Sequence, residues 1–362
     1  MTCRTFIALS PSKQIRLRYH LVMKSHGPTL IAERTAVDSE TFMRDVASGS
    51  TPVVLRQQVA HWPATTAGRS GPRPIADYIR QFGGGDPLDT MIGAPEIQGR
   101  FFYVPDCTGF NFVRQKVPLM GLMAELLRLA ESGDPAPHAI YANAAAASAH
   151  LPGWAEVNPL NLPVDATARL WIGNAVAVAT HYDASPNLAC VVSGRRRFTL
   201  FPPEQLANLY VGPLDHTLAG PPVSMVDPEM HDLQRYPRFA TAWASAQTAE
   251  LGPGDAIFIP ALWWHHVRAL DPINVLVNYW WGETDAAAPF LALVHAMMAV
   301  RDRPAAERLA WRNWFEHLVF DDDAAQAGVH LPEHVRNVLG SPSRERSLRI
   351  QRFLVASLQQ MM

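Results

Sequence analysis

The segment from Trp171 to Pro203 contains the only His-x-Asp triplet of the chain, His181-Tyr182-Asp183. The residues around it favour an extended strand, in which side chains repeat with a period of two. His181 and Asp183 would then project from the same face and could bind one metal ion together. Because the chain has 14 histidines, a single match of this kind is a weak signal by itself. The triplet therefore needs a third ligand from elsewhere in the sequence.

A second candidate segment, from Pro253 to Trp281, supplies two adjacent histidines, His265 and His266. This segment also has the composition of strands, so neighbouring residues would face opposite sides. Two histidines and one carboxylate form the facial triad of non-haem Fe(II) oxygenases, which leaves coordination positions open for a substrate and oxygen. The sequence therefore predicts a metal site that combines His181 and Asp183 with one histidine of the pair.

An arginine in the segment after the triplet is predicted to point into the protein interior. If Ser193-Gly194 forms a two-residue turn, the flanking strands form a hairpin in which Val191 is paired with Arg196. Arg196 then shares a sheet face with Asn187 and with apolar side chains. A buried guanidinium requires a partner, and a carboxylate is the natural one. That carboxylate could belong to an Asp or Glu of the chain or to a bound ligand, and the sequence leaves both alternatives open.

Composition limits the classes of partner. The chain has 362 residues, of which 48% are hydrophobic, and this is enough for one large core or for one core with an appendage. A net charge of −2 gives no basic surface for nucleic acid or for an anionic membrane. No apolar run approaches the ~18 residues of a membrane span. We therefore expect no nucleic-acid partner and no membrane partner.

The cysteines and the N-terminus bear on cellular location. Cys3, Cys107 and Cys190 form no set of pairs and no Cys-x-x-Cys motif, which favours a reducing, cytoplasmic environment. Residues 1–28 lack the apolar core of a signal peptide. We expect these residues to form a disordered leader.

Between residues 29 and 282 the pattern predicts a mainly β fold with α elements. Helices are expected at 37–48, with Asp38 or Ser39 as N-cap, and at 119–131, whereas 67–74 is expected to be a loop. Many short strands separated by Gly and Pro turns favour an antiparallel barrel or a jelly roll. The expected strands are 51–55, 101–104, 138–141, 168–173, 176–181, 187–192, 195–201, 223–226, 256–260, 263–268 and 273–281.

After Glu283 no strand pattern remains. Helical spacing at 286–301, 305–319, 333–339 and 344–360 predicts a helical region over residues 283–362. The first of these helices is strongly apolar and must be covered by the chain's own core or by a second subunit. We expect a homodimer that forms through the C-terminal helices.

These motifs resemble those of the cupin-like, JmjC-type Fe(II)/2-oxoglutarate-dependent oxygenase family, and within it the asparaginyl hydroxylase that acts on hypoxia-inducible factor. The resemblance implies a double-stranded β-helix, which is a jelly-roll or cupin fold, over residues 29–282. N-terminal α/β elements would belong to this domain, and residues 283–362 would form a C-terminal helical bundle. The matching pieces are PVVL at 52–55, HWPA at 61–64, HYD at 181–183, SGRRRFTLFPPEQ at 193–205, PGDAIFIP at 253–260, WWHHV at 263–267 and VNYWW at 277–281.

The resemblance also implies roles for single residues. His181, Asp183 and His265 would bind iron, because the family's ligand is the histidine directly after the tryptophan. Arg196 would bind the distal carboxylate of 2-oxoglutarate, at a position where relatives usually have a lysine. The remaining matches would be Tyr141, Asn187, Asn278 and, more weakly, Asn143 in the cosubstrate site, with Trp280 and Tyr182 on the substrate side.

The activity that the resemblance implies is that of a hydroxylase using Fe(II), 2-oxoglutarate and O₂. It would couple oxidative decarboxylation of 2-oxoglutarate to succinate with hydroxylation of a C–H bond in a protein or peptide side chain or in a small molecule. The stretches Ala67–Pro74 and Gly83–Gly85 are expected to shape access to the site. The alternative is a non-oxygenase cupin that binds a metal or another ligand, which would have no use for Arg196, Tyr141 and Asn187 as a carboxylate site.

Overall fold

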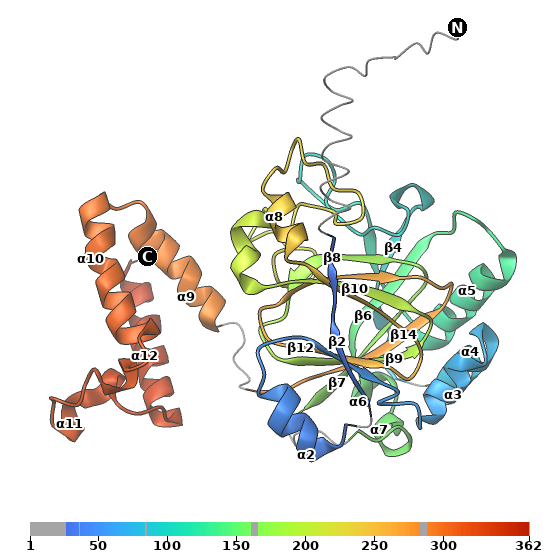
Figure 1. Ribbon diagram of the computed structural model, residues 1–362, viewed down its shortest axis with the longest axis horizontal. Coiled ribbons are helices and arrows are strands. Elements are labelled where there is room, and N and C mark those ends of the chain that lie inside the picture. The colour runs from blue at the N-terminus through green and yellow to red at the C-terminus, as the bar shows by residue number, and fades with distance from the viewer. Residues whose placement is uncertain (1–26, 36, 84, 161–165, 283–287, 362) are drawn as a thin grey trace, which may run out of the picture. The chain divides into compact units, whose positions relative to one another are not determined.

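The computed structural model describes residues 27–35, 37–83, 85–160, 166–282 and 288–361. The chain divides into two compact units, Met1–Thr284 and Asp285–Met362, and each is described here by itself (Figure 1). Almost all of the expected leader at 1–28 lies outside the described residues. Its disorder therefore stays a prediction.

Two β-sheets form the framework of the first unit (Figure 1). The larger sheet has nine strands in the order β2 (Ala32–Thr35), β3 (Val53–Arg56), β12 (Ala256–Ile259), β9 (Asn187–Ser193), β14 (Asn274–Trp280), β7 (Thr167–Gly173), β6 (Ala139–Ala146), β4 (Leu88–Gly93) and β5 (Val113–Val117). The smaller sheet has five strands in the order β1 (Thr29–Leu30), β11 (Gln247–Leu251), β10 (Arg196–Phe201), β13 (Trp264–Ala269) and β8 (Ala177–Tyr182). The expected mainly β architecture is confirmed.

The inner faces of the two sheets pack against each other. Ala189 and Leu276 of the larger sheet belong to the same buried cluster as Phe198 and Val267 of the smaller sheet. Side chains alternate along each strand, so every second residue of β9, β10, β13 and β14 points between the sheets. Chemistry-bearing residues at these alternate positions therefore meet in one interior space.

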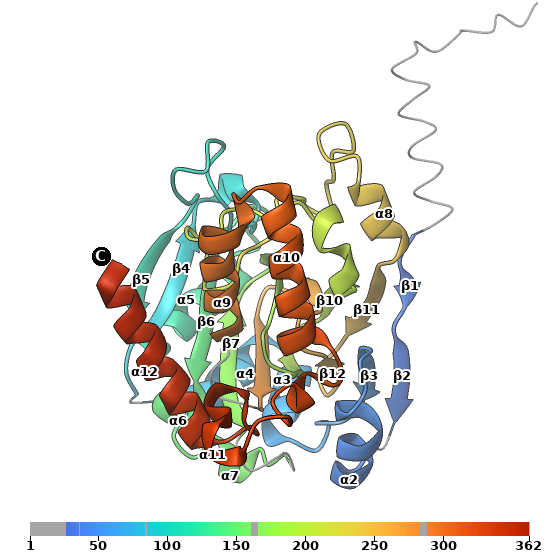
Figure 2. The ribbon, with the colours of Figure 1, turned by 90° about the vertical axis from the view of Figure 1, so that its left-hand side faces the viewer.

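The N-terminal strands lie at the outer edges of the sheets (Figure 2). β1 pairs in parallel with β11, and β2 pairs in parallel with β3. The helix that follows, α2 (Ser39–Thr41), continues as a π-helical turn, η1 (Phe42–Ala47). It begins at Asp38, whose carboxylate accepts a hydrogen bond of 2.7 Å from the N–H of Thr41. The expected helix at 37–48 and its N-cap are confirmed.

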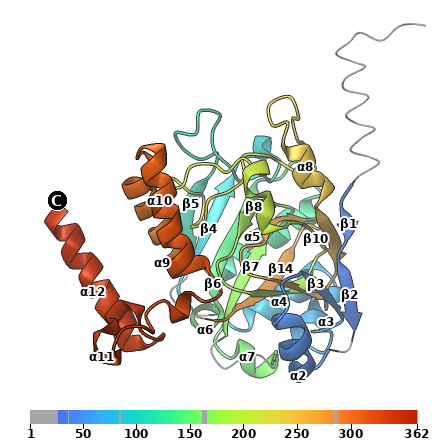
Figure 3. The same cartoon turned by 60° about the vertical axis from the view of Figure 1, so that its left-hand side comes forward.

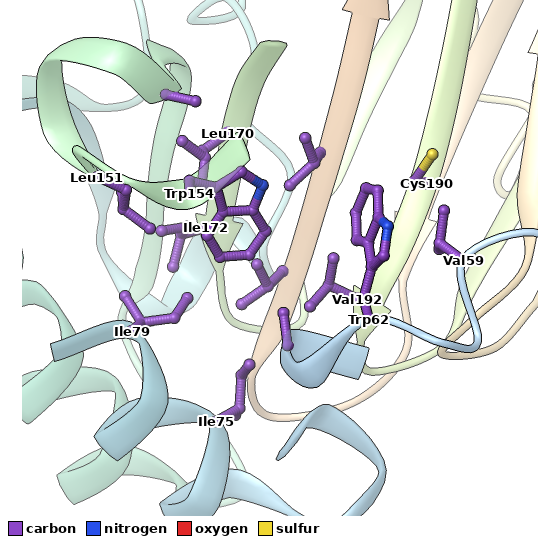
Figure 4. Close-up of a cluster of buried hydrophobic side chains, with 14 of the residues drawn as sticks. Val59, Trp62, Ile75, Ile79, Leu151, Trp154, Leu170, Ile172, Cys190 and Val192 are labelled. Carbon is purple, nitrogen blue, oxygen red and sulfur yellow. The ribbon is translucent and has the colours of Figure 1, made fainter. Parts of the chain in front are cut away.

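Helices cover the outer face of the larger sheet. Three of them, α3 (Pro63–Arg69), α4 (Pro72–Arg80) and α5 (Leu119–Ser132), share one apolar core with strands of this sheet. Trp62 and Trp154 are fully buried in this core, edge to face with ring centroids 6.3 Å apart (Figure 4). The expected long helix, α5, is confirmed. The shorter helices of this unit are η2 (Pro95–Ile97), α6 (Ala147–His150), α7 (Trp154–Val157), η3 (Pro203–Asn208) and α8 (Phe239–Ala244).

The expected loop at 67–74 is wrong. α3 and α4 occupy most of this stretch, and each has a proline in its first turn, where the missing N–H costs no intrahelical hydrogen bond. Gly68 is buried in α3, and a Cβ atom at this position would lie 2.0 Å from the carbonyl oxygen of Val192 in β9. The Gly and Pro residues of this stretch therefore serve close packing and helix initiation.

The substitution Gly68→Ala is expected to destabilise the fold by about 1–3 kcal/mol, which is typical of an extra methyl group in a packed core. The added atom would meet the backbone of β9, which has no rotamer to change. Gly121→Ala in α5 is the matched control, because its nearest neighbouring atom lies at 4.0 Å and alanine favours a helix. Chemical unfolding compares the two variants. Equal free energies of unfolding would contradict the close contact of α3 with β9.

β9 and β10 do not form the hairpin expected around Ser193-Gly194. β9 pairs with β12 and β14 in the larger sheet, whereas β10 pairs with β11 and β13 in the smaller sheet. The chain passes from one sheet to the other at Gly194, whose φ of +72° favours glycine. The expected pairing of Arg196 with Val191 is therefore wrong. Alternation predicts the face of a side chain but not the partner of its strand, and Arg196 still points between the sheets.

Other strand predictions were also wrong or incomplete. The segments expected at 101–104 and 223–226 form only isolated bridges, such as those of Tyr103 with Phe110 and of Val211 with Ser224. The sequence analysis did not predict β4, β5 or β11. β5 reads Val-Arg-Gln-Lys-Val and is mostly exposed at the edge of the larger sheet, so no apolar face reveals it in the sequence.

The second unit consists of helices, coloured orange to red in Figure 3. Helices appear in all four stretches where the sequence predicts them. No helix in the described part of the chain is long and apolar enough to cross a bilayer. The elements are α9 (Ala288–Ala296), η4 (Met297–Arg301), α10 (Ala305–Phe315), η5 (Glu316–Phe320), η6 (Ala324–Gln326), α11 (Glu333–Arg336), η7 (Asn337–Leu339) and α12 (Arg344–Met361).

Candidate metal and cosubstrate site

The three predicted metal ligands come together at the end of the smaller sheet. His181 of β8 and His265 of β13 are directly paired, and Asp183 follows immediately after β8. One potential ligand atom from each residue lies within 4.8 Å of those of the other two. His265 Nε2 is 3.7 Å from Asp183 Oδ2. This group of two imidazoles and one carboxylate, called the triad below, has the donor set of a facial Fe(II) site.

A β-bulge in β8 sets the direction of His181. His265 pairs with His181, whereas Val267, two positions further on, pairs with Val178, three positions back. β8 therefore has one extra residue between these two rungs, as expected for a bulge beside a functional site. In a regular strand, residues three positions apart would face opposite sides. Because of the bulge, His181 and Val178 line the same cavity.

Both histidines of the triad have their Nδ1 atoms bound to backbone carbonyls. His181 Nδ1 lies 2.9 Å from the oxygen of Ala179, and His265 Nδ1 lies 3.0 Å from that of Trp263. A carbonyl only accepts, so each Nδ1 donates its proton and the lone pair of Nε2 stays available for a metal. Burial, and secondarily the neighbouring His181, lowers the pKa of His265 to about 4. The ring of His265 is therefore neutral near pH 7, as a ligand must be.

A relay of hydrogen bonds holds the carboxylate of the triad. Trp171 Nε1 donates to Asn278 Oδ1 at 2.6 Å, and Asn278 Nδ2 donates to Asn187 Oδ1 at 3.1 Å. Asn187 Nδ2 then donates to Asp183 Oδ2 at 2.8 Å, and Trp280 Nε1 donates to the same oxygen at 3.2 Å. Asp183 Oδ2 is thereby fixed by two donors. Asn187 and Asn278 thus orient a metal ligand besides lining the cavity.

Asn278→Leu is expected to weaken Fe(II) binding about 10- to 100-fold, the usual cost of removing a group that supports a metal ligand. The substitution removes the donor that holds Asn187, which in turn holds Asp183. Asn158→Leu is the matched control, since this buried asparagine accepts from the N–H of Ala64 outside both cavities. Anaerobic titration with Fe(II) measures both affinities. Unchanged iron binding in Asn278→Leu would contradict the relay.

A cavity lies between the sheets and reaches the triad. It is called the inner cavity below. Tyr141, Asn187, Arg196 and Asn278, which were predicted to bind the cosubstrate, all line it. The other lining residues besides the triad are Trp171, Val178, Ala189, Phe198, Ile259, Val267 and Leu276. A small acid bound here would therefore meet a polar site within apolar walls.

Arg196 lines the inner cavity and has no carboxylate partner in the described part of the chain. The residue is 2% exposed. Its Nη2 donates to the carbonyl oxygen of Trp171 at 3.3 Å, and its Nε has no hydrogen-bond partner among the described residues. Burial lowers the pKa of this guanidinium, and Tyr141 partly offsets that effect. Of the two alternatives left open by the sequence, the buried charge therefore fits a ligand carboxylate rather than an internal ion pair.

Tyr141 is buried beside Arg196. Its ring stacks on Trp171, with centroids 6.1 Å apart, and on Phe101, with centroids 6.3 Å apart. Burial raises the pKa of its hydroxyl above the ordinary value, although the charge of Arg196 opposes this shift. The phenol therefore stays protonated and can donate a hydrogen bond to an acceptor in the inner cavity.

A second cavity, called the outer cavity below, also reaches the triad. Trp280 lines it, on the side expected for a substrate. Asn143 lines the outer cavity and not the inner one, so its place in the cosubstrate site stays a prediction. The remaining lining residues are Met91, Phe101, Tyr141, Ala144, Trp171, Ala177, Val178, Ala179, His181, Asp183, Leu218, Ala219, Pro221 and Val223.

Two residues next to the triad point to the other face of the smaller sheet. Tyr182 packs edge to face on Trp264, with ring centroids 5.0 Å apart, and lines neither cavity. Its predicted place on the substrate side is wrong, because adjacent residues of a strand face opposite sides. His266 has its ring nitrogens near the carboxylates of Asp227 and Glu229 and is therefore not available to the triad.

The segments expected to shape access do not reach the site. No described residue of 67–74 or 83–85 lines either cavity. The outer cavity is bordered instead by the segment 218–223. Trp171 is a site residue that the sequence analysis did not identify, although it supports Asn278 and Arg196. Its only signal is an aromatic residue in the strand before the His-x-Asp triplet.

Comparison with known proteins places this site in a family. The family model described as "Cupin-like domain" matches residues 39–287. The chain is 40% identical over 112 residues to the lysine-specific demethylase JMJ31 of Arabidopsis thaliana, a match covering 31% of this chain and 20% of the relative. It is 39% identical over 115 residues to HSPB1-associated protein 1 of Homo sapiens, covering 31% and 22%. It is 40% identical over 102 residues to tRNA wybutosine-synthesizing protein 5 of Danio rerio, covering 28% of each.

These matches span only 20% to 28% of the length of the curated relatives named above. The particular likeness to the asparaginyl hydroxylase stays a prediction. The family model, in contrast, covers both strands of the triad and both cavities. The chain therefore belongs to the cupin-like family, in its JmjC-type branch.

Proposed function

We propose that the protein is an Fe(II)- and 2-oxoglutarate-dependent hydroxylase. It would couple oxidative decarboxylation of 2-oxoglutarate to succinate and CO₂ with hydroxylation of a C–H bond, so that one oxygen atom enters succinate and the other enters the product. The observation that carries this proposal is Arg196, a buried cation that has no carboxylate partner among the described residues and lines the same cavity as the triad. A metal site with a purely structural role would have no need for it.

Each part of the site has a distinct task in this proposal. His181, Asp183 and His265 would hold Fe(II), which with the cosubstrate supplies the oxidation. Arg196 would bind the distal carboxylate of 2-oxoglutarate through two parallel hydrogen bonds, a geometry that the lysine of other family members cannot offer. Tyr141 would donate a third hydrogen bond. The apolar walls of the inner cavity would exclude water, which strengthens these interactions.

Anaerobic titration of the metal-free protein with Fe(II) and then 2-oxoglutarate tests the proposal. A chelated 2-oxo acid should produce a visible charge-transfer band at micromolar to millimolar cosubstrate. Addition of O₂ should then yield succinate. A protein that binds iron but shows neither the band nor succinate would instead be a non-oxygenase cupin that binds a metal or another ligand.

The substrate in this proposal is a protein or peptide side chain or a small molecule. Relatives whose names include "lysine-specific demethylase" and "HSPB1-associated protein" support a protein substrate. We also propose that the protein acts in the cytoplasm, since its cysteines include no predicted disulfide framework. Fractionation of cells that express a tagged full-length chain tests this location.

We propose further that the second unit mediates self-association. Its helices carry large exposed apolar side chains, among them Leu291, Trp314 and Phe353. Such surfaces on a helical unit are typical of interfaces. Light scattering should give a molar mass twice that of one chain. The substitution Trp314→Glu should reduce this molar mass to that of a single chain. A monomeric full-length chain at micromolar concentration would contradict the proposal.

A further inference from the structure

The charge of the substrate can be inferred from the outer cavity and from Arg169, a residue with no assigned role. We propose that the outer cavity selects a substrate that places an uncharged, apolar group at the triad and carries a carboxylate for Arg169. The inference rests on the proposed function, because it concerns the substrate of that same site.

The lining of the outer cavity is unsuited to a cation. Among its described lining residues Asp183 is the only formally charged one, and that carboxylate belongs to the triad. The other walls are mostly apolar, formed by residues such as Met91, Phe101, Leu218 and Val223. A cationic group such as a methylated lysine would lose its hydration here without meeting a free carboxylate. An uncharged apolar group suits these walls.

Strand pairing places Arg169 on the cavity side of the larger sheet. Arg169 of β7 is directly paired with Asn278 of β14. Directly paired residues share a sheet face, and Asn278 lines the inner cavity. The guanidinium of Arg169 lies 5.5 Å from the ring centroid of Trp280 and donates from Nη1 to the carbonyl oxygen of Ala144 at 3.1 Å. Both of these neighbours line the outer cavity, so Arg169 stands at its border.

The charge of Arg169 is not neutralised within the described part of the chain. Its hydrogen-bond partner is a backbone carbonyl, its Nε is buried without a partner, and none of the described carboxylates forms an ion pair with it. Uncompensated charge next to a low-dielectric cavity attracts anions and repels cations over several ångströms. The ring of Trp280 could attract a cationic substrate group, but the guanidinium of Arg169 already lies next to this ring. Within the described residues, the border of the outer cavity is thus positive at Arg169.

The backbone of β6 is distorted in a way that supports this arrangement. The register of β6 with β7 shifts between Ala142 and Ala145, and Ala144 has a φ of +50°, a left-handed conformation that costs energy for alanine. The distorted residue is the one whose carbonyl holds Arg169. Asn143 beside it lines the outer cavity. The strained conformation of Ala144 has a purpose if its carbonyl must hold Arg169 in position for a ligand.

Probes of equal shape and different charge test the inference. Hexanoate, hexanamide and hexylammonium are titrated into the full-length protein loaded with Fe(II) and saturating 2-oxoglutarate without oxygen, so that Arg196 is already occupied. Changes in the charge-transfer band and calorimetry report binding. Hexanoate should bind at least about tenfold more tightly than hexylammonium, with hexanamide between them. Short peptides with Leu-Glu or Leu-Lys pairs show whether the carboxylate comes from a peptide or from a small acid, and either source supports the inference.

Variants assign the preference to Arg169. Arg169→Gln should abolish the difference between hexanoate and hexylammonium, and Arg169→Lys should retain it, while the affinity for 2-oxoglutarate stays unchanged in both. Arg195→Gln, which removes an exposed arginine paired with Glu250 and Asp271, should leave the preference intact. Hexylammonium binding as tightly as hexanoate, or a preference that survives in Arg169→Gln, would overturn the inference. Absence of the charge-transfer band in every protein would instead count against the proposed function.

Discussion

Arg196→Met is expected to raise the dissociation constant of 2-oxoglutarate at least about 100-fold. Arg196 is the only Arg or Lys that lines the inner cavity among the described residues. Two charge-assisted hydrogen bonds of about 1.5–3 kcal/mol each would be lost, and a 100-fold change corresponds to about 2.8 kcal/mol. Methionine fills a similar space without a charge. Calorimetric titration of the iron-loaded protein without oxygen measures the change, and Arg196→Lys should lose much less.

The same variant should show a second effect on stability. In the absence of cosubstrate, Arg196 is a buried cation whose Nε has no partner in the described part of the chain, so its removal should leave the free energy of unfolding unchanged or increase it. At 100 times the wild-type dissociation constant, 2-oxoglutarate should stabilise the wild type by about 2.7 kcal/mol but a 100-fold weaker binder by only about 0.4 kcal/mol. Unfolding with and without cosubstrate measures both quantities. A large loss of stability without cosubstrate would mean that Arg196 serves the fold and not a ligand.

His265→Gln is expected to weaken Fe(II) binding by more than about 100-fold, because even groups behind a ligand contribute 10- to 100-fold. The adjacent residue provides the matched control. His266 is similarly buried and lies on the same strand, but its ring is on the face of Asp227 and Glu229. His266→Gln should therefore keep iron binding and the charge-transfer band. Anaerobic iron titration, with circular dichroism to verify folding, compares the two variants.

The opposite ranking would contradict the assignment of the triad. If His266→Gln lost iron and His265→Gln retained it, the site would be the group of Asp227, Glu229 and His266. Equal losses of iron affinity with intact circular dichroism would mean that both histidines support one metal. This outcome would contradict the alternation of side chains along β13.

The sequence was sufficient to predict most of what depends on alternation and local spacing. The His-x-Asp triplet and the histidine pair predicted His181 and Asp183 with one histidine of the pair, and the family resemblance selected His265 by the tryptophan before it. The inward direction of Arg196 followed from its apolar neighbours. Apart from the choice of His265, these predictions require only the face of each strand. The C-terminal helices were equally accessible, because helical spacing is a local property.

The features that were mispredicted depend on contacts between distant segments. The Ser193-Gly194 turn looked like that of a hairpin, but β10 finds its partners in β11 and β13. Tyr182 was assigned to the substrate side although its neighbours in a strand already occupied that face. The stretch 67–74 looked like a loop, but most of it belongs to α3 and α4, which pack against the larger sheet.

The hydrogen-bond relay behind Asp183 has a single polarity. An indole N–H at one end can only donate, and a carboxylate at the other can only accept, so neither Asn187 nor Asn278 can flip its amide without bringing two donors or two acceptors together. The orientations of all four groups are therefore decided as one unit when the sheets assemble. The carboxylate of Asp183 therefore loses its rotational freedom when the protein folds. Binding of iron then requires no further ordering of this ligand.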